Sequence, residues 1–463
     1  MSSYSGRGQW GATAIAAVAL LALSFAFGGA SREHALRLAV VEIAALPLLV
    51  FGLRNALKSG VRQDHGLALG LLAGLAAVPL VQLIPLPPAV WTGLPGREDL
   101  TLALSLVGLS PSWMPLSLTP DLTWGSFLAL LPPLAAFLGV LAVTREVKQR
   151  LVWIYMGATA CAVCLGALQL ASGSTAFYPW ETTAAGNVTG FFANRNHMAT
   201  LLLTSLPFAA ALSGGAMRRG SRRAQTLIWL SALYIGLAVV TLGVIRSRAG
   251  LVLAGPTLGG AFLAAWVASG RGRPGPAILA LAGATTAAVV AVAAFALAPI
   301  MARFDTVGAP EGRFEVWPTV AEAANTYLPV GSGVGSFDAV YRSVEPLVRL
   351  DATYTNQVHN EYLQLWLETG WFGIGLIILF LIWWGRRTWT AWRSSPSSEH
   401  DLQRAASVAI PIVMLHSVVD YPLRTATMMV IFALCAALLE GAGAAITAPA
   451  ARRPRRSEAG VSQ

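Results

Sequence analysis

A histidine stands where a long polar segment meets an apolar one. The sequence reads HNEYL at 359–363 and GWFG at 370–373, and it continues into the apolar run 374–384. Imidazole is the side chain whose ordinary pKa lies nearest neutrality, so His359 could accept a proton from a hydroxyl group. A polar cluster at the mouth of a membrane helix is costly in hydrocarbon, which favours a functional site over an ordinary helix start.

Arginines occupy further polar segments between apolar runs. Arg195 lies in GFFANRNH (190–197), Arg246 and Arg248 lie in RSRAG (246–250), and Arg313 lies in GRFEVWP (312–318). A guanidinium is always charged and offers a planar fork to phosphate oxygens, so Arg248 and Arg313, with help from Arg246, could hold a phosphorylated group. Otherwise Arg246 and Arg248 anchor helix ends in lipid headgroups, and Arg313 pairs with a neighbouring glutamate.

Other polar residues near the same segments have plain structural explanations. Asn194 and Asn196 either satisfy backbone groups at a helix start or contact a bound substrate. Capping or bonding between helices explains His197 and His416. For DYPLR at 420–424, we favour an ion pair between the first and last residues.

Cofactor and metal motifs are weak or missing. Gly331-x-Gly333-x-Gly335 follows no predicted strand, so a turn is favoured over a dinucleotide site or an anion-binding nest. Cys161 and Cys164 share a helix face in a predicted span, where small core residues are expected. No D-x-D or H-x-x-x-H ligand spacing occurs in the chain. We therefore expect a reaction without metal or cofactor.

The composition excludes a soluble protein. Hydrophobic residues make up 55% of the chain and charged residues 12%, and the mean hydropathy is +0.62. Soluble proteins are about 25% charged. The net charge of +10 could suggest nucleic acid, but the basic residues are dispersed in short clusters between apolar runs. This pattern indicates membrane lipids rather than nucleic acid as the partner.

We predict an all-α polytopic membrane protein in which residues 1–463 form a single transmembrane domain. Because about 20 apolar residues cross a bilayer, about 12 transmembrane helices are expected. The predicted spans are 11–29, 35–53, 66–84, 122–143, 151–171, 197–213, 226–245, 249–268, 276–298, 366–385, 405–420 and 424–440.

The basic loops set the predicted orientation. A cytoplasmic N-terminus places the arginine-rich segments 218–223, 386–404 and 452–456 inside. Both termini then face the cytoplasm, and the candidate residues lie near the outer leaflet. A large, partly helical outer loop covers 299–358, and a Pro-rich loop at 85–121 is expected along the interface.

These segments together resemble the O-antigen ligase and polymerase family of integral-membrane enzymes. GFFxNxN, the pair Ser247-Arg248, the block Arg313…Trp317 with Gly331-x-Gly333, and His359-Asn360-x9-Gly370-x2-Gly373 occur in the family's order. The resemblance covers about residues 190–385.

The resemblance implies a glycosyltransferase of the bacterial inner membrane with a periplasmic active site. The donor would be a saccharide on a polyprenyl diphosphate, and other polysaccharide-assembly proteins would be further partners. A polymerase joins glycans into O-antigen or exopolysaccharide, whereas a ligase passes glycan to lipid A core. We favour the polymerase, because no part of the large loop has the features of a site for phosphorylated lipid A.

The expected site follows from the motifs and the resemblance. The resemblance points to His359, Arg248 and Arg313 as the catalytic residues. We assign substrate binding to Arg246, Asn360, Arg195, Asn194 and Asn196. A lipid-linked saccharide flippase is the rival from another class, and it predicts ionisable residues spread across membrane depth. Glu42 is the clear mid-span acid, and its role stays open.

Overall fold

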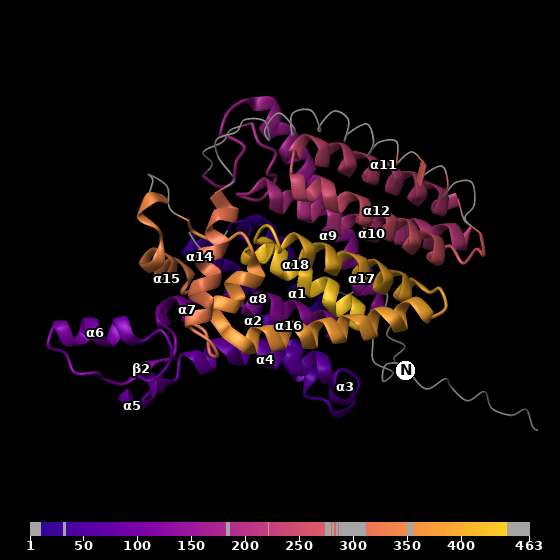
Figure 1. Cartoon of the computed structure of the whole chain (residues 1–463). Helices are drawn as coiled ribbons and strands as arrows, with labels where there is room; N and C mark the ends of the chain where they lie inside the picture. Colours follow the sequence, from indigo (N-terminus) through magenta and orange to yellow (C-terminus); the bar gives the residue numbers. More distant parts are fainter. Residues whose placement is uncertain are drawn as a thin grey trace, which may run out of the picture.

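The computed structural model describes residues 11–30, 34–181, 186–220, 222–273, 312–349 and 355–441, with 279, 282, 283 and 286. Over these residues the chain is predominantly α-helical, with a single short strand pair (Figure 1). Seven described helices are long and apolar enough to cross a membrane, and three shorter apolar helices accompany them. The predicted all-α polytopic membrane protein is confirmed. Most of the predicted span 276–298, like residues 299–311, lies outside the described residues.

The first half of the chain contains nine helices and one short antiparallel strand pair within the described residues. They are α1 Ala12–Phe27, α2 Ala35–Ala56, α3 Ser59–Asp64, α4 Gly66–Gln82, β1 Pro85–Leu86, α5 Pro88–Trp91, α6 Glu98–Leu106, β2 Met114–Pro115, α7 Pro120–Ala129, α8 Leu131–Ala142 and α9 Arg145–Ser172. The predicted span 122–143 is thus two consecutive helices. Pro132 and Pro133 lack backbone N–H donors, and they occupy the first turn of α8, where such donors are not needed.

The second half contains the segments that carry most of the candidate residues. Its described helices are α10 Arg195–Arg219, α11 Arg222–Ile245, α12 Arg248–Ala268, α14 Gly312–Thr326, α15 Phe337–Val344, η1 Leu347–Arg349, α16 Glu361–Arg393, α17 Ser398–His416, η2 Pro422–Arg424 and α18 Ala426–Glu440. The predicted spans in this half correspond to α10, α11, α12, α16, α17 and α18. The predicted large loop is partly helical, because α14 and α15 lie in it.

Helix α10 is the centre of one half of the bundle, and it contacts α9, α11, α12 and α17. Small residues bring α10 and α12 together in parallel. A Cβ at Gly250 would lie 2.9 Å from the Cβ of Ala199, and one at Gly214 would lie 2.2 Å from the carbonyl oxygen of Ala265. Glycines of this kind let membrane helices approach closely. The first turns of α10 and α12 therefore lie side by side, as Figure 1 shows for the two helices.

The other half of the bundle packs α1, α2, α8 and α18 against one another. Gly52 of α2 faces Leu138 of α8, and Gly139 of α8 faces Leu48 of α2. At the end of α1, the Gly28 carbonyl accepts a hydrogen bond from the amide of Thr427 in α18. These contacts bring the end of α1 beside the start of α18.

A glycine-rich turn docks on a kink in α16. Gly370 interrupts the helix with φ +55°, and the amide of Trp371 donates to the carbonyl of Pro329. The amides of Ser332 and Gly333 donate to carbonyls of the α16 turn before the kink. The turn interpretation is supported, since these amides are used within the protein. The 329–331 segment approaches Gly370 so closely that a side chain there would clash with the carbonyl of Pro329.

Ion pairs mark the opposite end of the bundle from His359. The buried carboxylate of Glu440 contacts Nδ1 of His65 at 2.6 Å and accepts from Arg387 and from the indole of Trp383. Arg218 lies 2.6 Å from Asp401 at the same end. Below, the "His359 end" means the end at which α1 and α17 finish and α10, α12, α16 and α18 begin.

The prediction that Cys161 and Cys164 are core residues is wrong. Cys161 and Cys164 are exposed on α9, and only Cys435 is buried. Their shared face therefore points away from the core of the bundle.

Candidate active site

His359 is held in an unusual conformation directly before α16. Its φ is +55°, a value that costs free energy for a residue with a side chain and persists only where the surroundings enforce it. The next residue, Asn360, caps the helix, and its Oδ1 accepts from the amides of Tyr362 and Leu363. The imidazole is partly exposed, with 24% of the side chain accessible. Strain of this kind is typical of functional positions.

A buried carboxylate faces the imidazole. Asp420 follows α17, is 1% exposed, and places Oδ1 3.4 Å from Nδ1 of His359. Its Oδ2 accepts from Nδ2 of Asn196 at 2.5 Å. Burial alone would raise the pKa of Asp420, but its close contact with His359 and the nearby imidazoles of His197 and His416 lower it below its usual range. The Asp420 carboxylate therefore faces the His359 ring on its Nδ1 side.

The predicted pair between Asp420 and Arg424 is wrong. The short helix η2 turns Arg424 toward α16, where its Nη2 lies 3.2 Å from Oε2 of Glu368. The other oxygen of Glu368 accepts from Gln364 at 3.1 Å. Asp420 instead points toward the first turn of α10. Contacts across the bundle thus outweigh the local one.

The start of α10 supplies the second wall of the site. Asn194 is the N-cap and accepts from the amide of Asn196, while Arg195 donates to Oδ1 of Asn187 at 3.1 Å. The expected helix-start role of Asn194 is confirmed. Asn196 departs from the expected backbone role, because its side chain bonds to Asp420.

The two histidines near this helix start differ. His416 contacts the hydroxyl of Thr200 through Nδ1 at 2.7 Å, so the predicted bond between helices is present. His197 is 2% exposed, and neither ring nitrogen has a hydrogen-bond partner within the described residues. Its ring lies edge-on to Phe192 and Tyr421. Neither capping nor a bond between helices therefore explains His197.

Tyr421 stands between the two imidazoles. Its ring centroid lies 4.8 Å from that of His359 and 5.2 Å from that of His197, with edge-on geometry in both pairs. Asp420 and Tyr421 were not proposed as site residues from the sequence. The sequence offered one signal for a site here, namely two polar residues in an otherwise apolar stretch. A local ion pair between Asp420 and Arg424 accounted for that signal as well.

The three motif arginines differ in how much of their surroundings the structure describes. Arg248 begins α12 beside the cap Ser247, whose Oγ accepts from the amide of Gly250 at 3.2 Å. Because Gly250 packs on Ala199, Arg248 starts its helix at the His359 end. Arg246 is exposed and has φ +54°. Arg313 lies in the first turn of α14, but its side chain is outside the described residues.

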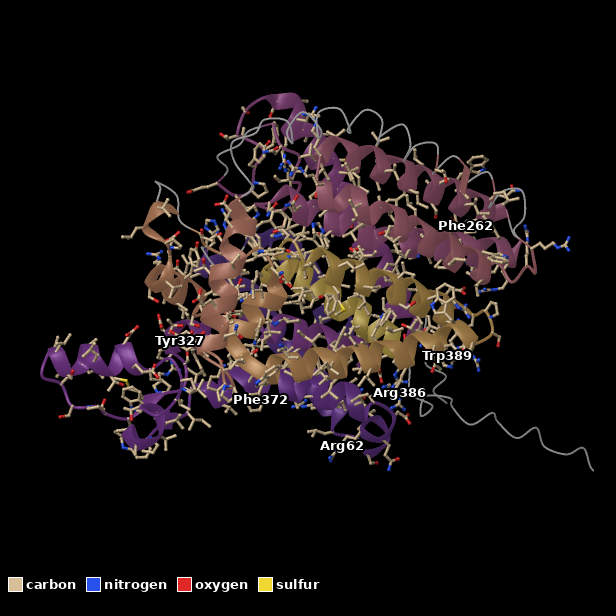
Figure 2. All side chains as sticks on the ribbon, in the orientation of Figure 1. Arg62, Phe262, Tyr327, Phe372, Arg386 and Trp389 are labelled. Carbon is tan, nitrogen blue, oxygen red and sulfur yellow. The ribbon has the colours of Figure 1, made fainter. Side chains whose placement is uncertain are left out.

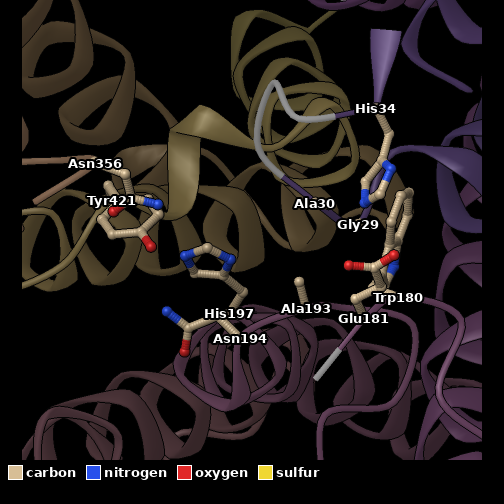
Figure 3. A pocket seen from close by; sticks show the side chains of 10 residues that line it. All are labelled: Gly29, Ala30, His34, Trp180, Glu181, Ala193, Asn194, His197, Asn356 and Tyr421. Carbon is tan, nitrogen blue, oxygen red and sulfur yellow. The ribbon is translucent and has the colours of Figure 1, made fainter. Parts of the chain in front are cut away.

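A small cavity opens between the starts of α10 and α2. Its volume is about 130 Å³. Figure 3 shows His197, Asn194 and the pair Asn356 and Tyr421 on one side. His34, Trp180 and Glu181 form the other side, with Gly29, Ala30 and Ala193 completing the wall.

The described residues form no group of three or more His, Cys, Asp or Glu side chains that could hold a metal ion. The expected independence from metal stays a prediction.

The described ion pairs at the His359 end join helix starts and turns, and Figure 2 shows polar side chains gathered at both ends of the bundle.

Comparison with known proteins agrees with the motifs. Residues 233–378 match the family model described as O-antigen ligase. The matched segment contains Arg246, Arg248, Arg313, His359 and Asn360. No curated protein matches the chain. The predicted limits 190–385 for the ligase-like region stay a prediction. Residues 233–378 of this membrane protein are a domain of the O-antigen ligase family, as the sequence motifs indicate.

Proposed function

We propose that the protein transfers glycan from a polyprenyl diphosphate to a hydroxyl group of a second glycan, at the periplasmic face of the bacterial inner membrane. The O-antigen ligase domain makes it a membrane glycan-transferring enzyme of O-antigen assembly. The observation that carries the finer proposal is the contact of His359 with the buried Asp420, at the bundle end where Arg248 begins α12.

His359 acts as the general base in this proposal. Its Nδ1 faces the Asp420 carboxylate, which favours a proton on Nδ1 and leaves Nε2 to accept one. The acceptor hydroxyl attacks the anomeric carbon and gives its proton to Nε2, and the bond from that carbon to the diphosphate oxygen breaks. Asp420 then stabilises the imidazolium that forms. A base of this kind contributes roughly 10²–10⁴ in rate.

Arginines neutralise the leaving group. Arg248 stands at the N-terminus of α12, where the helix dipole also favours an anion. Arg313, in the first turn of α14, is the second proposed diphosphate ligand, and Arg246 assists. The charge on the diphosphate oxygens grows as the bond to the sugar breaks, so these cations stabilise the transition state more than the bound donor.

The remaining assigned residues hold the glycan or the backbone around it. The Asn194 and Asn360 side chains already accept from backbone amides, so their Nδ2 atoms are the groups that could bind sugar hydroxyls. Arg195 bonds to Asn187 and Asn196 bonds to Asp420. For Asn196 we propose that it positions Asp420, in addition to its assigned contact with substrate.

The flippase alternative receives less support. A transport pathway needs ionisable residues spread through the membrane. The ion pairs between described residues instead gather at the His359 end and at the end that contains Glu440, apart from a surface pair within α15. Glu42 is the mid-span acid, and none of these ion pairs between described residues includes it.

Gel analysis of surface glycans from a deletion strain tests the function. We expect lipid A core carrying a single repeat unit, which is the product left when polymerisation stops. Bare core together with carrier-linked polymer would establish the ligase alternative instead. An unchanged ladder of long-chain glycan would overturn both activities.

A further inference from the structure

We infer that the 130 Å³ cavity beside His197 binds an uncharged sugar ring of the glycan, adjacent to the transfer site. The inference rests on the proposed function, and it adds which part of the substrate this cavity takes. His197 and Ala193 lie on the α10 side of the cavity, and Glu181 and His34 lie opposite (Figure 3).

His197 is the observation that points to a ligand. Its ring lines the cavity and is 2% exposed, and neither nitrogen has a hydrogen-bond partner within the described residues. A buried polar group without a partner costs about 1–3 kcal/mol. A neutral imidazole offers one donor and one acceptor, which is what a sugar hydroxyl needs. Ligand binding would satisfy a group that the protein leaves unsatisfied.

The charge of the lining favours an uncharged ligand over the diphosphate in this cavity. None of the described lining residues is a lysine or an arginine, and Glu181 brings a carboxylate. Phosphate recognition relies on cationic donors, which are instead found at the start of α12. The amide groups of Asn194 and Asn356 add donors and acceptors of the kind that hydroxyl groups use.

The size and surroundings favour a single ring. The cavity volume of about 130 Å³ suits one small ligand and leaves no room for several linked rings. Trp180 forms a wall rather than a stacking platform, because Arg37 covers its ring at 4.6 Å and His34 lies against it. Ring stacking is therefore not the main contact. Hydrogen bonds from His197 and the two asparagines would hold the ligand.

The cavity is connected to the reacting groups through Tyr421. The ring of this residue contacts His197, which lines the cavity, and His359, which does not. A sugar ring in the cavity would therefore lie one aromatic side chain away from the general base. The next residue of the glycan chain could then reach His359.

The test uses the full chain in lipid nanodiscs. The probe is the phosphate-free repeat-unit oligosaccharide, released by mild acid from the host's own glycan, and saturation-transfer NMR measures its binding. Ala193→Phe places a ring at the cavity wall, and Ala176→Phe makes the same change at an exposed alanine outside the cavity. We expect Ala193→Phe to weaken binding by on the order of tenfold or more, and Ala176→Phe to bind as the natural chain does.

A second pair of variants isolates His197. His197→Leu removes the two nitrogens without breaking a hydrogen bond of the described structure, so folding should be retained. We expect weaker oligosaccharide binding for His197→Leu and partial recovery for His197→Gln. Equal binding by the natural chain, Ala193→Phe and His197→Leu would overturn the inference, as would the absence of binding to the natural chain.

Binding of radiolabelled polyprenyl diphosphate separates this inference from the proposed function. We expect Ala193→Phe and His197→Leu to retain it. If both variants lose the lipid diphosphate along with the oligosaccharide, the cavity is not a site for the uncharged ring. If the natural chain itself binds no polyprenyl diphosphate, the proposed function fails whatever the oligosaccharide does.

Discussion

At the scale of individual residues, a positive backbone φ distinguishes two of the candidate site residues. Among the described residues other than glycine, His359 and Arg246 have them. Each such residue costs on the order of 1–3 kcal/mol, so the surrounding contacts must enforce the conformation. For His359, the Asn360 cap and the contact with Asp420 do so. Both residues had been chosen from their sequence motifs.

Asp420→Asn tests the positioning of the base. The variant keeps the shape of the side chain but loses the charge that stabilises the protonated imidazole. We expect kcat to fall by about 10² while KM changes little, since a misplaced group can cost that much. Asp420→Glu keeps the charge and should recover part of kcat. Equal kcat for the natural chain and Asp420→Asn would remove Asp420 from the mechanism.

The contribution of Arg248 to turnover should depend on both its charge and the planar shape of its guanidinium. Arg248→Ala removes a donor to the diphosphate, and we expect a loss on the order of 10²–10³ in turnover. Arg248→Lys keeps a positive charge without the planar fork, so it should recover part of the activity. Arg342→Ala, which breaks a surface pair within α15, is the control and should leave turnover unchanged. Equal activity of all three variants would remove Arg248 from the mechanism.

The roles of His359 and Arg248 as site residues could be predicted from the sequence because each lies in a short motif of neighbouring residues. Asp420 was missed because its partners, His359 and Asn196, come from distant parts of the chain. Local spacing suggested Arg424 as the partner of Asp420. In the fold, Arg424 contacts Glu368 instead. A single sequence carries no direct signal for such a contact.

At the scale of elements, close packing of α10 and α12 sets the place of Arg248. Hydropathy predicted both spans, since each is a long apolar run. It could not predict their pairing, which depends on the positions of Gly214, Gly250 and their partners. The kink at Gly370 was likewise missed, because a glycine within an apolar run does not reveal whether the helix breaks.

Gly214→Ala should destabilise the protein. The new Cβ would lie 2.2 Å from the carbonyl oxygen of Ala265, so the helices must move apart, at a cost of about 1–3 kcal/mol. Gly255→Ala is the matched control, because nothing lies within 4 Å of its Cβ. Alanine is the better helix former, so the control should be neutral or stabilising. Thermal unfolding in detergent measures both, and equal midpoints would contradict the close contact.

At the scale of the whole molecule, the predicted orientation places the His359 end outside the cytoplasm. Ser336, in the large outer loop, is fully buried and would not react with a labelling reagent. Leu347, in the same loop, is 84% exposed. In a chain whose three cysteines are replaced, Leu347→Cys should react with a membrane-impermeant maleimide in intact spheroplasts. Labelling only after permeabilisation would reverse the orientation.

The most direct test of the account is loss of His359 in cells. A deletion strain complemented with His359→Ala should make normal amounts of protein but no long-chain glycan, and lipid-linked donor should accumulate at the periplasmic face. His400→Ala is the control, because His400 lies on α17 at the opposite end of the bundle. Quantitative gels of surface glycan with extraction of carrier lipids provide the measurement. Normal long-chain glycan from the His359→Ala strain would contradict the proposed mechanism.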